Sequence, residues 1–71
     1  MLWLWNRTVS RADELRAQAR EKKRVAAMAR RAGRALSTES DRAMMLRHAT
    51  ALEAEAAALE AEADALEPPQ R

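Results

Sequence analysis

The chain has 71 residues, a net charge of +2 at neutral pH and no cysteine. A domain this small buries little surface, so its stability usually requires disulfides, a metal or self-association, and disulfides are excluded here. It has no run of about 20 apolar residues, which excludes a bilayer-spanning helix. The lack of cysteine fits a reducing compartment, and we expect a cytoplasmic location. Ala, Leu, Glu, Arg and Lys dominate, and because these residues form helices well, the sequence predicts an all-α fold.

An apolar segment occupies residues 1–6, and a basic helix is predicted over 7–36. Ser10 stands three residues before Asp13, a spacing similar to a capping box at a helix start. Apolar or small side chains then recur at alternating intervals of four and three residues, with Lys22 as the one interruption, which indicates a coiled-coil seam. The residues with this spacing are Ala12, Leu15, Ala19, Ala26, Ala29, Gly33 and Leu36.

A turn is predicted over 37–40, because Ser37 or Thr38 can cap a new helix and the acidic residues that follow suit a helix N-terminus. An acidic helix is predicted over 39–67, ending before a proline pair that opens the tail 68–71. Large apolar residues recur in it every seven positions, with alanines between them. They are Met45, Leu52, Leu59 and Leu66, alternating with Ala49, Ala56 and Ala63.

Two arrangements can use this spacing: an antiparallel hairpin, or one unbroken helix in a long parallel coiled coil, since the turn contains neither Gly nor Pro. In the hairpin, Gly33 faces Met45 and Ala26 faces Leu52, so that nearly every layer pairs a small side chain with a large one. A parallel dimer would stack Ala on Ala in alternate layers. The sequence therefore favours an antiparallel two-helix hairpin with an Ala/Leu seam.

Charge favours the same choice. Residues 1–36 hold ten Lys or Arg and three Asp or Glu, whereas residues 37–71 hold three and eight. In an antiparallel hairpin, oppositely charged side chains fall along one edge of the seam and favour this orientation. They are Arg16, Lys23 and Arg30 on the first helix, and Glu53, Glu60 and Glu67 on the second.

Further apolar side chains widen the stripe near the turn, and two helices cannot cover them all. Burying a Leu or Met side chain is worth about 1.5–3 kcal/mol, so exposed copies favour association. We expect a homodimer that forms a four-helix bundle, or binding to another helical protein. The predicted interaction patch comprises Val25, Met28, Ala32, Met44 and Leu46, together with Trp3 and Trp5 near the N-terminus.

Catalytic and metal chemistry find no candidate residues in the sequence. His48 is the only histidine, and no Gly-rich phosphate loop or nucleophile motif is present. The carboxylates of the second helix lack the Glu-x-x-His pattern of a di-metal bundle site and are expected to form a solvated face. We therefore expect no enzymatic activity, no metal or cofactor and no small-molecule substrate.

Two other partner classes remain open. Leu2, Trp3, Leu4 and Trp5, followed by a basic helix, are typical of an anchor at a membrane surface, because indoles favour the headgroup region and cations favour anionic lipid. Nucleic acid is the less expected partner, since no base-reading motif or aromatic platform is present. Its phosphates could still pair with the basic run of the first helix, which comprises Arg20, Lys22, Lys23, Arg24, Arg30, Arg31 and Arg34.

Around the turn, a basic alanine-rich helix leads through a capping turn into Asp-Arg-x-x-x-Leu and then a Leu-Glu-rich helix. The residues concerned are Arg24-Val25-Ala26 to Ala32, Leu36-Ser37, Asp41-Arg42, Leu46, Ala49 and Leu52-Glu53. Over roughly residues 20–60 the chain thus resembles a type of short helical protein frequent in alphaproteobacterial genomes. That type often has Asp-Pro in the turn, where this chain has Thr38-Glu39-Ser40. The resemblance implies a helical hairpin and no activity.

Overall fold

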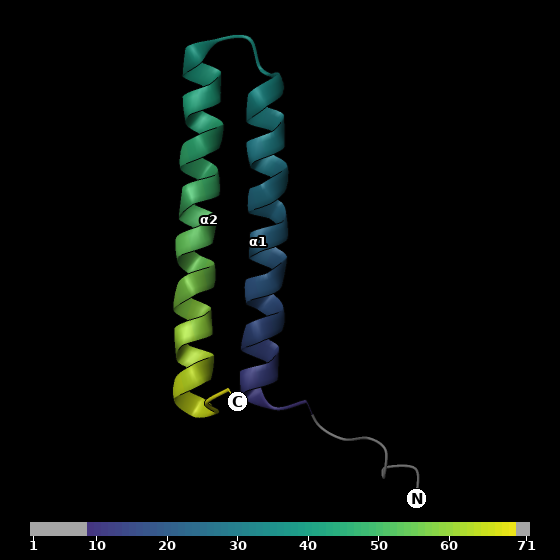
Figure 1. Ribbon diagram of the computed structural model, residues 1–71, viewed down its shortest axis with the longest axis vertical. Helices are drawn as coiled ribbons and strands as arrows, with labels where there is room; N and C mark the ends of the chain where they lie inside the picture. The colour runs from purple at the N-terminus through teal and green to yellow at the C-terminus, as the bar shows by residue number, and fades with distance from the viewer. Residues whose placement is uncertain (1–8, 70–71) are drawn as a thin grey trace, which may run out of the picture.

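The computed structural model describes residues 9–69 as two helices joined by a short turn. Helix α1 spans Arg11–Ala35 and helix α2 spans Glu39–Leu66. Figure 1 shows the two helices side by side and running in opposite directions. The predicted all-α hairpin is confirmed, and the alternative of one unbroken helix is wrong.

Side-chain capping at Ser10 defines the start of α1. The backbone of Ser10 is extended, and its hydroxyl accepts a hydrogen bond from the Asp13 N–H at 3.0 Å. The C-cap is Leu36, whose backbone is also extended and whose N–H donates to the Gly33 carbonyl at 3.2 Å. The helix is therefore shorter than the predicted range 7–36, because the capping residues have left the helical conformation.

The turn is closed by side chains and requires neither Gly nor Pro. The Thr38 hydroxyl accepts from the Asp41 N–H at 3.1 Å and caps α2. Arg42 reaches back to the two residues that follow α1: its Nε donates to the Leu36 carbonyl at 2.8 Å and its Nη2 to the Ser37 carbonyl at 3.5 Å. These bonds tie the start of α2 to the connecting segment. The helices are consequently interrupted only at 36–38, whereas the predicted turn covered 37–40.

The seam between the helices is built mainly of small side chains. Leu15, at 1% exposure, is the largest fully buried side chain of the described residues. At the turn end the helices approach closely, since a Cβ atom on Gly33 would lie 3.2 Å from the Met45 Cβ. The buried residues are Ala12, Leu15, Ala19, Ala26, Ala29 and Gly33 in α1, and Ala49, Ala56 and Ala63 in α2.

The larger seam residues are covered less completely. Met45, Leu52 and Leu59 are half-buried and pack against the buried alanines, and Leu36 at the end of α1 is also half-buried. Leu66, predicted as a seam residue, is 57% exposed. The chain leaves the helical path at Ser10, so α1 supplies no further turn to cover Leu66, and its assignment to the closed seam is wrong.

Candidate association surfaces

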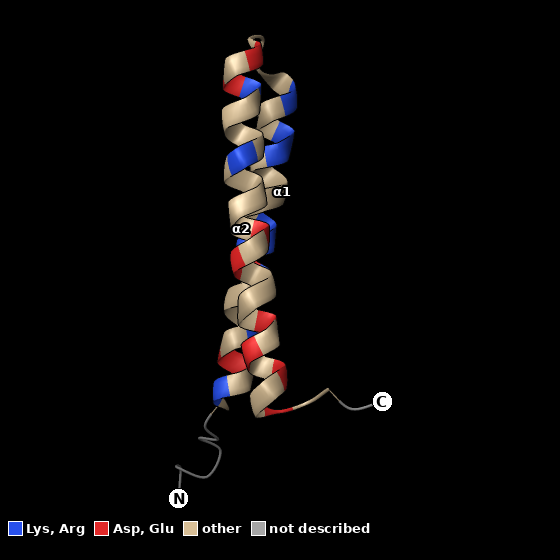
Figure 2. Cartoon of the chain, turned by 90° about the vertical axis from the view of Figure 1, so that its left-hand side faces the viewer, with Lys and Arg blue, Asp and Glu red and all other residues tan. Residues whose placement is uncertain are grey.

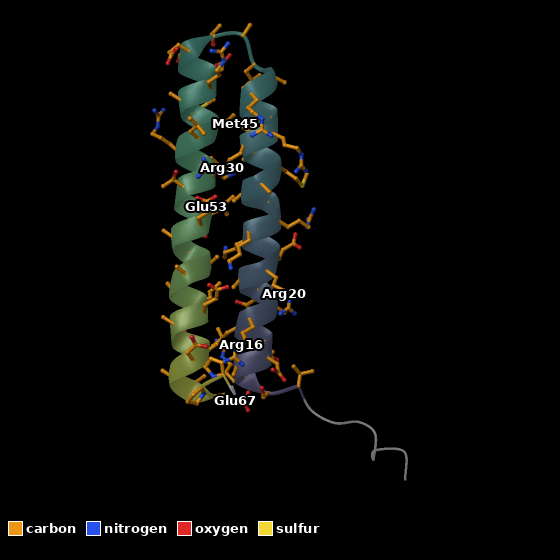
Figure 3. All side chains as sticks on the ribbon, in the orientation of Figure 1. Arg16, Arg20, Arg30, Met45, Glu53 and Glu67 are labelled. Atoms are coloured by element: carbon orange, nitrogen blue, oxygen red, sulfur yellow. The ribbon has the colours of Figure 1, made fainter. Side chains whose placement is uncertain are left out.

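One edge of the seam carries the ion pairs predicted from the sequence. Each joins a cation of α1 to a carboxylate of α2, and Figure 3 labels both partners of two of them. The distances are 3.8 Å for Arg16 Nη1 to Glu67 Oε1, 2.7 Å for Lys23 Nζ to Glu60 Oε2, and 2.6 Å for Arg30 Nη2 to Glu53 Oε1. Arg16 also donates to Asp64 at 3.0 Å. This edge favours the antiparallel register, because a slip of one heptad along the seam would leave Arg30 without its partner Glu53.

The Arg30–Glu53 pair has the best geometry of the three. The guanidinium donates from Nε at 2.9 Å and from Nη2 at 2.6 Å to the two carboxylate oxygens. This hydrogen bonding is the main cause of a lowered pKa at Glu53 and a raised pKa at Arg30. Within α1, hydrogen bonding to Arg24 likewise lowers the pKa of Glu21. Both pairs are side-chain links on a solvated surface, with no feature of a catalytic acid or base.

Lys22, the interruption in the seam spacing, forms a further link between the helices that the sequence analysis missed. Its Nζ lies 2.9 Å from Glu55 Oε1, on the edge of the seam opposite the Arg30–Glu53 pair. A lysine can lay its methylene stem along an apolar seam while its ammonium group stays in water. The signal was present in the sequence, because a lysine at a seam position must direct its charge to one edge.

A shallow apolar hollow of about 270 Å³ lies on the Lys22–Glu55 side near the turn. Met28 at its rim is 46% exposed, and Met44 is 52% exposed. Met44 lies one helical turn from His48, so it faces the same side of α2. We call this surface the methionine hollow; its lining consists of Val25, Met28, Ala29, Ala32, Met45 and His48.

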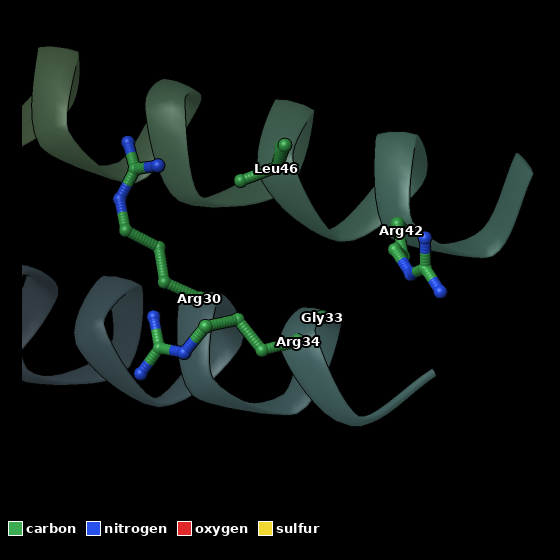
Figure 4. A pocket seen from close by; sticks show the side chains of 5 residues that line it. All are labelled: Arg30, Gly33, Arg34, Arg42 and Leu46. Carbon is green, nitrogen blue, oxygen red and sulfur yellow. The ribbon is translucent and has the colours of Figure 1, made fainter. Parts of the chain in front are cut away.

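A second hollow of about 290 Å³ lies on the other side of the seam. Figure 4 shows its lining of Arg30, Gly33, Arg34, Arg42 and Leu46, and we call it the arginine hollow. Leu46 there is 47% exposed. Met44 and Leu46 are two positions apart in the sequence, and side chains with this spacing point about 200° apart around a helix. They therefore cannot face the same side of α2.

The predicted interaction patch is therefore divided. Val25, Met28 and Ala32 line the methionine hollow and Leu46 lines the arginine hollow, so that treating them as one surface was wrong. Trp3 and Trp5 lie outside the described residues, as do Leu2 and Leu4 of the suggested membrane anchor.

Charge is distributed unevenly along the hairpin, as Figure 2 shows. In the half nearer the turn, residues 25–52 hold five arginines and two carboxylates, a balance of +3. In the half nearer the chain ends, residues 9–24 and 53–69 hold six cations and nine carboxylates, a balance of −3. Arg31, Arg34 and Arg47 of the turn half form no salt bridge within residues 9–69. Arg7 and Arg71 reduce the balance of the end half to −1 over the whole sequence, so the two halves of the hairpin still differ in the sign of their charge.

Comparison of the chain with protein-family models, curated proteins and solved structures found no match. Across residues 9–69 no group of three or more His, Asp or Glu side chains is placed to hold a metal ion. Neither described helix has the length and apolar character needed to cross a membrane. The features of residues 9–69 that bear on function are thus the two hollows, the paired edges and the charge asymmetry.

Proposed function

We propose that the chain is a non-enzymatic helical interaction module that acts by association, and that the methionine hollow is its docking surface. The observation that carries this proposal is the exposure of Met28 and Met44, at 46% and 52%, beside an apolar depression. The expected occupant is helical: a second copy, which would complete a four-helix bundle, or another helical protein.

The energetics support association. Full burial of a Met side chain is worth about 1.5–3 kcal/mol, so covering two half-exposed methionines would contribute roughly that amount in total. The hairpin's own core is small, because alanine supplies most of the buried residues. A domain of this size commonly relies on self-association for the remainder of its stability.

Light scattering on a sizing column at low and at high salt tests this function. We expect a dimer under both conditions, because burial of apolar surface is not screened by salt. Met28→Glu should shift the protein towards monomer, since a carboxylate would be forced into the apolar contact. Leu46→Glu is the matched control, because Leu46 is equally exposed at 47% but lies in the arginine hollow.

Circular dichroism should show that both variants remain helical. Equal dimerisation of Met28→Glu and Leu46→Glu would contradict the assignment of the methionine hollow. A wild-type protein that stays monomeric at every concentration would contradict self-association.

Non-specific nucleic-acid binding is a second candidate function, favoured by Arg31, Arg34 and Arg47, which have no carboxylate partner within residues 9–69. Phosphate contacts of this kind weaken steeply as salt rises. Fluorescence anisotropy with a labelled duplex should then show a salt slope that the double variant Arg31→Gln with Arg34→Gln reduces by about two. Binding that ignores both substitutions would contradict this candidate.

A further inference from the structure

Resting on the proposed association, we propose that the occupant of the methionine hollow is a second copy of this chain packed end for end, so that the turn of each hairpin lies beside the open end of the other. The apolar surface, the charged edge beside it and the charge asymmetry of the whole hairpin each support this arrangement.

The apolar surface extends beyond the hollow along the whole of α2. Met45 lines the hollow, and Leu52, Leu59 and Leu66 follow it at seven-residue intervals, which keeps them on the same side of the helix. Leu52 and Leu59 are only half-buried, and Leu66 is 57% exposed. A second hairpin lying along this side would cover the apolar stripe of α2 from Met45 to Leu66. Beside this stripe α1 continues towards the open end with Gln18 and Glu21 at the positions equivalent to Val25 and Met28.

The charged edge beside this apolar surface changes character along its length. His48 lines the hollow near the turn, and Glu55 and Glu62 follow at the same seven-residue interval. Glu55 is paired with Lys22 at 2.9 Å, whereas Glu62 forms no salt bridge within residues 9–69. From the turn to the open end, this edge therefore carries the imidazole of His48, then the Lys22–Glu55 ion pair, and then the unpaired carboxylate of Glu62.

If a second copy is turned end for end about an axis at Glu55, this charged edge lies against the same edge of the first copy. Because His48 and Glu62 lie equally far from Glu55 along α2, a two-fold axis at Glu55 brings Glu62 of one copy to the level of His48 of the other. The same operation brings Leu66 to the level of Met44, so that apolar side chains meet. At the axis, each Lys22 comes close to Glu55 of both copies.

Two copies packed in the same direction would lack these matches. Glu62 would face Glu62, and the turn halves, each with a balance of +3 in the described residues, would lie side by side. Like charges placed opposite one another disfavour an interface. The reversed pair instead sets the turn half, at +3, beside an end half whose balance is −3 in the described residues and −1 when Arg7 and Arg71 are counted. Charge thus selects the direction of a contact that apolar burial drives.

Cysteine cross-linking in the full chain tests the direction, because the natural sequence contains no cysteine. His48→Cys and Glu62→Cys proteins of distinguishable mass are mixed, allowed to exchange and oxidised. A disulfide requires Cα atoms within about 7 Å, so the end-for-end pair predicts a mixed 48–62 disulfide, in about tenfold excess over either homodisulfide. Arg34→Cys, in the arginine hollow, is the control and should not cross-link.

A second measurement, the change in dimer affinity on substitution of Glu62, is expected to have opposite signs for end-for-end and same-direction packing. Glu62→Gln should weaken an end-for-end dimer by about threefold, because it removes a carboxylate that lies beside the basic turn half. It should strengthen a same-direction dimer, because it removes the repulsion between two facing carboxylates. A dimer that yields homodisulfides and is strengthened by Glu62→Gln would overturn the end-for-end arrangement and leave the proposed function standing. A strictly monomeric wild-type protein would overturn the end-for-end arrangement and self-association together, and would leave another helical protein as the occupant of the methionine hollow.

Discussion

Leu15 should dominate the stability of the hairpin, and Leu15→Ala is the most direct test of the seam. Leu15 is 1% exposed and packs with Ala12, Ala63 and Leu59 near the open end. Truncation of a buried leucine costs about 2–5 kcal/mol, depending on how far the site can collapse. The site lies near the helix ends, where partial closure is possible, so we expect about 2–3 kcal/mol.

That loss is large for a protein of this size. At about 0.05–0.15 kcal/mol per residue, the whole chain is expected to have a stability of roughly 4–10 kcal/mol. Urea unfolding followed by circular dichroism measures the effect, with every variant at one protein concentration because association adds to apparent stability. Leu46→Ala is the control, since the same atoms are removed at a site that is 47% exposed, and should cost about 1 kcal/mol. An equal or smaller loss for Leu15→Ala would refute the assignment of Leu15 as the principal core residue.

Three further predictions concern the close approach, the caps and the charged edge. Gly33→Ala should change stability by less than about 1 kcal/mol, because higher helix propensity offsets the new 3.2 Å contact, whereas Gly33→Leu should cost about 1–3 kcal/mol in urea unfolding. Ser10→Ala and Thr38→Ala should each cost about 1 kcal/mol, visible as a lower melting temperature, because each removes an acceptor for a free helix N–H. Since Arg30 lowers the pKa of Glu53 below its ordinary 4.5, the stabilisation by this pair is present above that pH and is lost as pH falls through the folded-state pKa. Glu53→Gln should therefore lower stability at neutral pH and flatten its decline in acid, and an unchanged pH profile would contradict the role of the pair.

The register of the hairpin could be read from the sequence because two independent patterns specify it. Small and large residues alternate along the seam, and the close approach of Gly33 to Met45 is the contact that this alternation predicts. The charges that flank the seam demand the same register, and Arg30 meets Glu53 as expected. The register is the position of one helix along the other and is a single variable, so two patterns that agree on it are sufficient to predict it.

The contacts that the sequence analysis missed depend on the direction in which a long side chain extends from its helix. Arg42 occupies a position that could have served the seam, yet its guanidinium reaches the Leu36 and Ser37 carbonyls. Those acceptors become available only once α1 has ended, so no pattern along the sequence reports them. The division of the interaction patch is different, because the angle between Met44 and Leu46 follows from helix geometry alone and could have been calculated.

The seam and the exposed apolar surface have a common origin. Ala49 and Ala56 let the two backbones approach closely, and a close approach leaves too little depth between the helices for a large side chain. Leu52 and Leu59 are consequently half-buried at the margin of the seam. A hairpin that gains its register from alanine thus leaves part of its leucine surface for a neighbour, and the residues that specify the fold also create the surface on which it would associate.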